Sequence, residues 1–288
     1  MKKIDKIIPL DNWIYFKLYT GYKTSDLILN EIVSEIIEKY EANGSIIKWF
    51  FIRYFDKGHH LRIRFEFSND INLNLIFKDL NYLFNFFREK YLIQKIEIDT
   101  YQREIERYGG YQKIGYSEKL FHEDSKMIIK YIRLSKNKNN PNLRWLFALS
   151  SVDYLLSDFG YNLNEKYELI TELGLYFKEE FGNSKGLKEQ LKIKYRENKD
   201  NINKYFLTLD SQYINFKSIL EIRSKGIKEI FDTETINDKN LKDHLLTSFI
   251  HMSLNRLFQA KNRTYELVCY DFLTMYYKSK IKKEQLNL

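Results

Sequence analysis

Two arginines lie in a short segment that alternates between polar and apolar residues, His60-Leu61-Arg62-Ile63-Arg64-Phe65-Glu66-Phe67. Because successive side chains of a strand point to opposite faces, Arg62 and Arg64 share one face with His60 and Glu66. Side chains two residues apart lie about 7 Å from each other, so the two planar guanidinium groups can bind one carboxylate or phosphate. The alternative is a solvated strand face on which acids neutralise the arginines.

A third arginine precedes a pair of glycines in Glu104-Ile105-Glu106-Arg107-Tyr108-Gly109-Gly110. Glycine adopts backbone conformations that other residues resist, and it lets a ligand approach the main chain closely. Arg107 is therefore a candidate anion-binding residue, with an ordinary turn as the alternative.

A polar stripe crosses an otherwise apolar helical segment between Lys242 and Ala260. Its members are spaced by four, three and four residues: His244, Ser248, His251 and Asn255. Polar groups inside an apolar helix need partners, and an imidazole transfers protons readily near neutral pH. His251 is therefore a candidate proton-transfer group, and a core histidine bonded to a loop carbonyl is the alternative.

Several familiar chemistries have no motif in this sequence. We find no G-x-x-x-x-G-K-[ST], G-x-G-x-x-G, H-E-x-x-H or G-x-S-x-G pattern. His59 and His60 are adjacent, so in a strand they point to opposite faces and do not form a metal site. Cys269 is the only cysteine, which excludes an internal disulfide and a thiolate metal cluster. We expect no metal and no cofactor.

The elements that must position these residues begin with a strand-rich part, residues 1–116. Periods of two and of three to four residues predict strands and helices in the order β-α-β-β-α-β, which is typical of a ferredoxin-like, split βαβ antiparallel sheet. The predicted strands are 13–19, 46–55, 60–67 and 93–101, and the predicted helices are 25–40 and 73–90.

The rest of the chain, residues 117–288, is predicted to be helical. The expected helices are 117–135, 142–158, 163–182, 184–197, 213–231, 238–259 and 262–281, with breaks at 137–140, 197–203 and 233–240. None of these breaks is long enough for a convincing linker, so we predict one α+β domain over residues 1–288.

Composition excludes several classes of protein. The 288 residues include 47 aromatic residues but only 2 Pro and 11 Gly, which excludes collagen-like and disordered chains. The excess of 47 Lys and Arg over 39 Asp and Glu gives a net charge of +8, but the basic residues are spread through the chain. We attribute this charge to compositional bias, and the charge alone does not assign a function. Neither a signal peptide nor an apolar run of about 18 residues is found, so we expect a cytoplasmic protein without membrane insertion.

Three segments in the same order resemble a known family. Trp49 to Phe65 resembles W-F-F-I-R-Y-x-D-P-x-x-H-L-R-L-R-F, residues 106–125 resemble E-R-Y-G-G followed by F-x-x-D-S, and residues 251–257 resemble H-M-x-x-N-R-L. These motifs are those of the C-terminal, glutamate-elimination domain of class I lanthipeptide dehydratases and of free-standing thiopeptide biosynthesis proteins of the same type. Lys57 stands where the family usually has Pro, which should loosen the hairpin turn without removing a reactive group.

The resemblance implies a reaction, its partners and its site. A separate dehydratase subunit uses glutamyl-tRNA to glutamylate Ser or Thr of a precursor peptide, and the elimination domain then removes glutamate to leave dehydroalanine or dehydrobutyrine. Because the tRNA-dependent step belongs to that partner, the resemblance implies no direct nucleic-acid contact for this chain. The catalytic residues of the family fall on Arg62, Arg64, Arg107 and His251. We expect the neighbouring residues to contact substrate: His60, Tyr108, Ser248 and Asn255.

Two other functions fit the same residues. A thiopeptide cyclase, which joins two dehydroalanines into a pyridine ring, has a related fold, although retention of the arginine and histidine positions favours elimination. A non-catalytic module that binds the precursor peptide by strand addition at a sheet edge is the second alternative.

Overall fold

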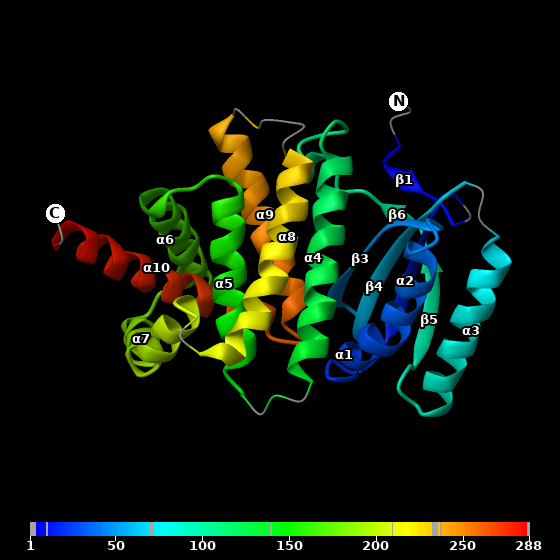
Figure 1. The fold of residues 1–288 in the computed structure, drawn as a ribbon, viewed down its shortest axis with the longest axis horizontal. Coiled ribbons are helices and arrows are strands. Elements are labelled where there is room, and N and C mark those ends of the chain that lie inside the picture. Colours follow the sequence, from blue (N-terminus) through cyan, green and yellow to red (C-terminus); the bar gives the residue numbers. More distant parts are fainter. Residues whose placement is uncertain are drawn as a thin grey trace. The chain divides into compact units, whose positions relative to one another are not determined.

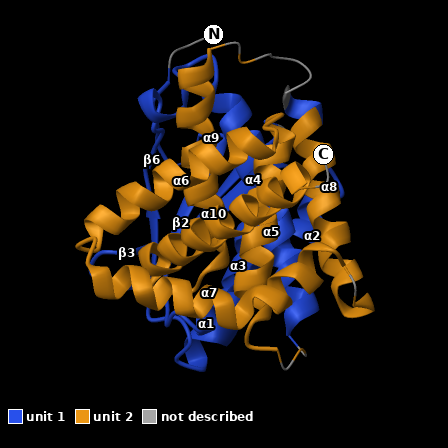
Figure 2. Cartoon of the chain, turned by 90° about the vertical axis from the view of Figure 1, so that its left-hand side faces the viewer, with its two compact units in different colours: residues 1–136, 229–235 blue, residues 137–228, 236–288 orange. Residues whose placement is uncertain are grey.

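The computed structural model of the chain describes residues 4–286 except 10, 70, 71, 137, 139, 209, 232–235 and 237. The chain divides into two compact units, residues 1–136 with 229–235 and residues 137–228 with 236–288 (Figure 2). Each unit is described by itself below. The organisation of residues 1–288 as one domain stays a prediction.

The first unit is built on a four-stranded antiparallel sheet in the order β3-β4-β2-β5 (Figure 1). Its strands are β2 (Trp13–Tyr19), β3 (Ile46–Phe55), β4 (His59–Phe67) and β5 (Lys95–Asp99). A second, two-stranded sheet pairs β1 (Lys6–Ile7) with β6 (Tyr101–Gln102). The helices of this unit are α1 (Thr24–Ile28), the π-helix η1 (Leu29–Val33), α2 (Ser34–Glu41), α3 (Leu73–Glu89), the 3-10 helix η2 (Glu106–Tyr108) and α4 (Ile114–Ser135).

The strand order confirms the predicted ferredoxin-like sheet. Along the chain, β2, the α1–α2 segment, β3, β4, α3 and β5 give the β-α-β-β-α-β order, and β2 lies between β4 and β5. The single predicted helix 25–40 contains the π-helical turn Leu29–Val33, which the sequence did not predict.

The two faces of the sheet have the predicted chemistry. Leu61, Ile63 and Phe65 of β4 are buried on one face, where Phe16 contacts Phe84 of α3 with ring centroids 5.9 Å apart. The other face carries Tyr15 opposite Arg64 and Lys17 opposite Arg62. The hydrophobic core of this unit therefore leaves the arginines on the polar face.

The second unit is helical. Its helices are α5 (Leu143–Asp158), α6 (Leu163–Glu180), α7 (Lys185–Phe206), the 3-10 helix η3 (Ser211–Tyr213), most of α8 (Ile214–Phe231), α9 (Lys239–Leu257) and α10 (Asn262–Leu286). None of the described helices is both long enough and apolar enough to cross a membrane.

The predicted break at 197–203 is wrong, because α7 continues through it to Phe206. Leu191, Tyr195, Ile202 and Tyr205 are all buried. Packing of this apolar face outweighs the weak helix propensity of the asparagines in the segment. Of the other predicted breaks, residues 137, 139, 233–235 and 237 lie outside the described residues.

Candidate functional site

Arg62 is held on β4 by three neighbours. Its Nε donates to Nε2 of His60 at 3.1 Å, its Nη2 lies 3.6 Å from Oδ2 of Asp56, and its guanidinium carbon lies 3.4 Å from the ring centroid of Tyr54. Nδ1 of His60 lies 3.0 Å from the carbonyl oxygen of Gly58. Burial lowers the pKa of His60, and the charge of Arg62 adds to this effect. Because Nε2 of His60 accepts a hydrogen bond from Arg62, the buried imidazole is neutral and orients the guanidinium group.

Arg64 lies in an aromatic enclosure. Its guanidinium carbon is 4.3 Å from the ring centroid of Tyr15, 4.7 Å from that of Tyr101 and 5.3 Å from that of Phe50. The residue is only 8% exposed and its Nε has no hydrogen-bond partner. Among the described residues, no carboxylate lies within ion-pair distance of Arg64. The enclosure therefore contains a buried positive charge that lacks a counter-ion.

The nearby acids are occupied by other cations. Glu66 pairs with Lys48 at 2.9 Å, and the fully buried Glu118 accepts from Nε and Nη2 of Arg103, each at 2.7 Å. Lys48 and the hydroxyl of Tyr101 also contact Glu118, at 3.3 and 3.0 Å. Glu66 therefore pairs with neither arginine of β4. The alternative in which acids neutralise the arginines holds for Arg62, which has Asp56 at 3.6 Å, but among the described residues it does not hold for Arg64.

Arg107 belongs to the same unit but to a different element. It lies in η2, where its Nη1 pairs with Oε2 of Glu104 at 2.9 Å. Gly109 and Gly110 follow with φ of 77° and 86°, so both occupy the left-handed region that glycine tolerates. Tyr108 is buried against Phe121, with ring centroids 5.0 Å apart.

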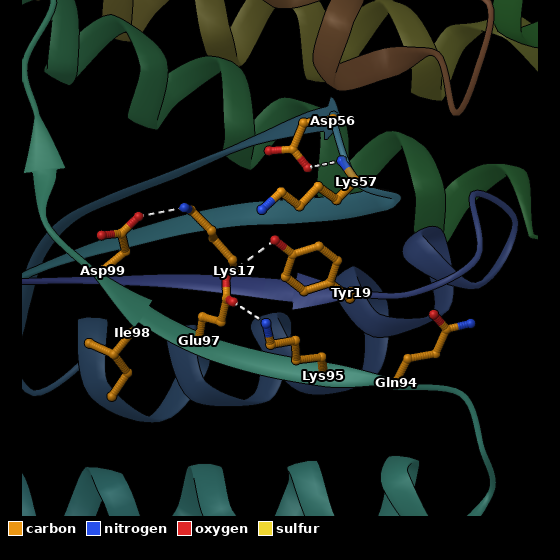
Figure 3. A pocket seen from close by; sticks show the side chains of 9 residues that line it. All are labelled: Lys17, Tyr19, Asp56, Lys57, Gln94, Lys95, Glu97, Ile98 and Asp99. Atoms are coloured by element: carbon orange, nitrogen blue, oxygen red, sulfur yellow. Dashed lines mark hydrogen bonds and ion pairs between the residues drawn. The ribbon is translucent and has the colours of Figure 1, made fainter.

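A polar hollow of about 690 Å³ opens on the arginine-bearing face (Figure 3). Lys17 on its floor pairs with Asp99 of β5, and the hydroxyl of Tyr19 donates to Oε2 of Glu97 at 3.2 Å. The hydrogen bond to Asp99 raises the pKa of Lys17, and the same bond lowers the pKa of Asp99. Its lining residues are Lys17, Tyr19, Asp56, Lys57, Gln94, Lys95, Glu97, Ile98 and Asp99.

His251 lies on α9 in the second unit. Its Nδ1 is 2.9 Å from Oε1 and 3.1 Å from Oε2 of Glu266, a fully buried carboxylate on α10. The His251 side chain is 30% exposed. A carboxylate that accepts from Nδ1–H leaves the lone pair of Nε2 available to accept a proton. Asp238 begins α9 by accepting hydrogen bonds from the backbone of Asn240 and Leu241.

The side chain of Glu266 is fully buried, and a second cation lies beside it. Nη1 of Arg263 lies 3.6 Å from its Oε2. Burial raises the pKa of Cys269 and of Tyr270, and the charge of Glu266 raises both further. Glu266 is therefore a buried carboxylate that lies within ion-pair distance of both His251 and Arg263.

The remaining members of the polar stripe differ in exposure. His244 is exposed, Ser248 is buried and Asn255 is partly buried. The backbone carbonyl of Asn255 accepts a hydrogen bond of 3.2 Å from the side chain of Asn262. No cluster of three or more potential metal ligands occurs among the His, Cys, Asp and Glu residues that the structure describes.

The structure brings His60, Arg62 and Arg64 together on one sheet face, and it places Arg107 and Tyr108 in the same unit. His251, Ser248 and Asn255 share α9 in the other unit. Sequence reasoning missed Glu266 and the enclosing Tyr15 and Tyr101. The sequence did contain a signal for Glu266, because this acid lies on a helix face that is otherwise formed by the buried Leu267, Tyr270 and Leu273.

Comparison with known proteins identifies similar chains. The family model described as "Lantibiotic biosynthesis dehydratase C-term" matches residues 13–277. The chain is 32% identical over 163 residues to the subtilin biosynthesis protein SpaB of Bacillus subtilis, a match that covers 55% of this chain and 15% of SpaB. It is 26% identical over 276 residues to the nisin biosynthesis protein NisB of Lactococcus lactis subsp. lactis, covering 91% of this chain and 25% of NisB. The chain thus spans a quarter or less of the curated relatives it matches.

Solved structures share the fold. The tRNA-dependent lantibiotic dehydratase MibB from Microbispora sp. 107891 superposes with a TM-score of 0.76 at 19% identity, covering 94% of this chain and 28% of MibB. The pyridine synthase TbtD from thiomuracin biosynthesis superposes with a TM-score of 0.63 at 14% identity, covering 94% of this chain and 99% of TbtD.

Proposed function

Because this chain belongs to the lantibiotic biosynthesis dehydratase C-terminal family, we propose that it eliminates glutamate from glutamylated Ser and Thr residues of a ribosomally made precursor peptide. The products are dehydroalanine and dehydrobutyrine. A separate subunit, acting with glutamyl-tRNA, adds the glutamyl group first, so this chain binds the precursor peptide and has no direct contact with tRNA.

The chemistry of this elimination defines what the protein must supply. A base removes the proton on Cα, the electrons of that bond form the Cα=Cβ double bond, and the Cβ–O bond breaks. Glutamate departs as a carboxylate with the electron pair of that bond. Negative charge develops on the enolate and on the leaving group, and cationic donors stabilise it.

The single observation that carries the proposal is the buried guanidinium of Arg64. A buried charge without a counter-ion is destabilising, and such an arrangement is retained where an anion binds. A carboxylate of the glutamyl group supplies that counter-ion, and the planar fork of arginine fits it. We assign Arg62 and Arg107 to the same task of binding carboxylate or enolate oxygens.

His251 is the proposed base. Glu266 accepts the hydrogen bond from Nδ1, which leaves Nε2 to take the α-proton, and its negative charge stabilises the imidazolium that forms. Glu266 is a positioning residue in this scheme. We assign His60 to the support of Arg62, and Tyr108, Ser248 and Asn255 to contacts with the peptide.

The test gives the purified chain a synthetic peptide with one glutamylated Ser and follows its mass. We expect loss of glutamate and a dehydrated residue, and we expect Arg64→Met to leave the glutamylated peptide unchanged. Arg133→Met, on the solvent side of α4, is the matched control and should retain wild-type activity. Absence of dehydration, with the glutamylating partner and the leader segment both present, contradicts the proposal.

The two alternative functions give different results in the same assay. A pyridine-forming cyclase leaves the glutamylated peptide intact and consumes a peptide that carries two dehydroalanines. A peptide-binding module without catalysis retains its effect on product formation after His251→Ala, whereas the proposed lyase loses it.

A further inference from the structure

The two edges of the four-stranded sheet differ in how their backbone groups are satisfied. On the β3 edge, Nδ1 of His122 lies 3.2 Å from the outward N–H and 3.1 Å from the carbonyl oxygen of Trp49, and the N–H of Phe51 donates to Oγ of Ser125 at 3.3 Å. Both side chains belong to α4. This helix therefore occupies the β3 edge and closes it to another strand.

The β5 edge has no strand beside it among the described residues of the first unit. There β5 pairs with β2 alone, in the register Tyr15↔Asp99, Lys17↔Glu97 and Tyr19↔Lys95. In β2 the N–H and C=O groups of even-numbered residues point to β4, as the bond from Thr20 N to His59 O at 3.1 Å indicates, so the odd-numbered residues bond to β5. The backbone groups of Ile96 and Ile98 consequently point away from the sheet. Within the part of the chain that the structure describes, no backbone group bonds to them.

The side chains of this edge suit a strand with alternating character. Ile96 and Ile98 lie opposite the buried Leu18 and Phe16 of β2 and are 36% and 47% exposed, and Ile98 is also among the residues that line the hollow. Lys95, Glu97 and Asp99 line the polar hollow on the other face (Figure 3). An added strand would place apolar side chains beside the isoleucines and polar side chains over the hollow.

The hollow is continuous with the arginine face. Lys17 on its floor lies directly opposite Arg62 in the β2–β4 register, and Asp56 on its rim lies 3.6 Å from Nη2 of Arg62. Its charged lining contains three lysines, Lys17, Lys57 and Lys95, and three acids, Asp56, Glu97 and Asp99. This balance suits polar uncharged side chains better than a strongly charged ligand.

A second copy of this chain fits the edge less well. When two β5 strands pair antiparallel over all five residues, Glu97 of each lies opposite Glu97 of the other, and like charges opposite each other are destabilising. A peptide substrate has no such constraint.

We propose that β5 binds an extended segment of the substrate peptide as a fifth strand of this sheet. The inference rests on the proposed function, which makes a peptide the substrate. Strands are about 4.8 Å apart, so the added strand lies about 14 Å from β4 and its arginines. The segment on β5 is therefore a recognition segment that flanks the residue undergoing elimination.

The test selects binders to the full chain from a displayed library of random, unmodified peptides, so that no elimination is needed. Enriched peptides are then made synthetically and added to the protein while amide hydrogen exchange is followed. We expect slower exchange at the amides of Ile96 and Ile98, with no comparable change at Trp49 and Phe51. No enrichment of any peptide, or protection confined to other segments, overturns the proposal.

Backbone changes supply the matched controls. N-methylation of the peptide at alternate residues should weaken binding about fivefold per position, because each removes a hydrogen bond to β5, whereas the intervening positions should tolerate it. Ile98→Pro removes one outward N–H and should weaken binding while the fold is kept, since proline is accepted on edge strands. Equal affinity across all N-methylated positions contradicts strand addition.

Two further outcomes separate this inference from others. Dimerisation of the chain that Ile98→Pro abolishes would assign the edge to self-association instead. Elimination from glutamylated peptides that continues unchanged in Ile98→Pro, with no protection of β5, overturns the docking proposal and leaves the proposed function standing. Peptide binding at β5 without any elimination activity supports the docking proposal and contradicts the proposed function.

Discussion

At the scale of single residues, Arg64 is the unusual feature of the molecule. Three aromatic rings surround its guanidinium group, and burial of a charge without a counter-ion opposes folding. Arg103 lies on the same unit but has a bidentate partner in Glu118. Replacing each arginine in turn therefore distinguishes a charge that binds substrate from a charge that stabilises the fold.

Arg64→Met should abolish glutamate elimination while the free energy of unfolding stays within about 1 kcal/mol of wild type or rises, because no protein partner loses a bond. Arg103→Met should instead destabilise the fold by about 3 kcal/mol, because it leaves buried Glu118 with weaker compensation. Urea unfolding and single-turnover elimination measure the two effects. A large loss of stability in Arg64→Met would mean that its charge serves the fold.

Glu266→Gln should lower kcat by about 100-fold with little change in KM. The amide keeps the size of the side chain but cannot stabilise the imidazolium that forms on His251. Steady-state kinetics on a glutamylated peptide separates the two constants, and Glu266→Asp should recover part of the rate. A change confined to KM would assign Glu266 to substrate binding.

At the scale of elements, α4 is attached to β3 and α2 by a polar cluster. His122 lies 3.5 Å from Glu41 through Nε2 and contacts the backbone of Trp49 through Nδ1. Burial works to raise the pKa of Glu41, but the hydrogen bond and charge of His122, together with Lys126, lower it to about 2.

A carboxylate with a lowered pKa stabilises the folded state above its unfolded pKa and loses that effect as pH falls through the folded pKa. The contribution of Glu41 should therefore be complete above its ordinary value of 4.5 and disappear between that value and about 2. Glu41→Gln should have lower stability at pH 7 and a flatter pH dependence in that window. Urea midpoints of both proteins at several pH values check this. Parallel curves for the two proteins would exclude Glu41 as the titrating group.

In the helices, the local residue pattern and tertiary packing sometimes favour different structures, and α7 is an example. The spacing of apolar residues predicted the order of the helices and nearly all of their bounds, because the residues that a helix buries recur every three or four positions. It predicted a break at 197–203 because asparagine and aspartate disfavour helix, but Ile202 and Tyr205 pack on the core and keep α7 continuous.

At the scale of the whole molecule, the open question is whether the two units unfold together. We propose one domain over residues 1–288. In Trp145→Phe the remaining tryptophans, Trp13 and Trp49, both report on the first unit, whereas the far-ultraviolet circular dichroism is dominated by helices, many of them in the second.

Thermal or urea unfolding of Trp145→Phe should give coincident fluorescence and circular dichroism transitions, because one cooperative domain unfolds in a single step. Phe for Trp keeps an aromatic side chain, so the fold should be retained. Two separated transitions would divide the chain into independently stable domains.

The sequence by itself determined the sheet order, the face on which Arg62 and Arg64 lie, the Gly-Gly turn after Arg107 and the helix that carries His251. These features follow from local periodicity and residue type, which act over a few neighbouring positions. Only the tertiary structure decided that Glu66 pairs with Lys48 rather than with an arginine, that Glu266 contacts His251, and that α4 closes one sheet edge while the described residues place no strand on the outer side of β5. The physical reason is that each of these partners comes from another element, so packing rather than local sequence selects it.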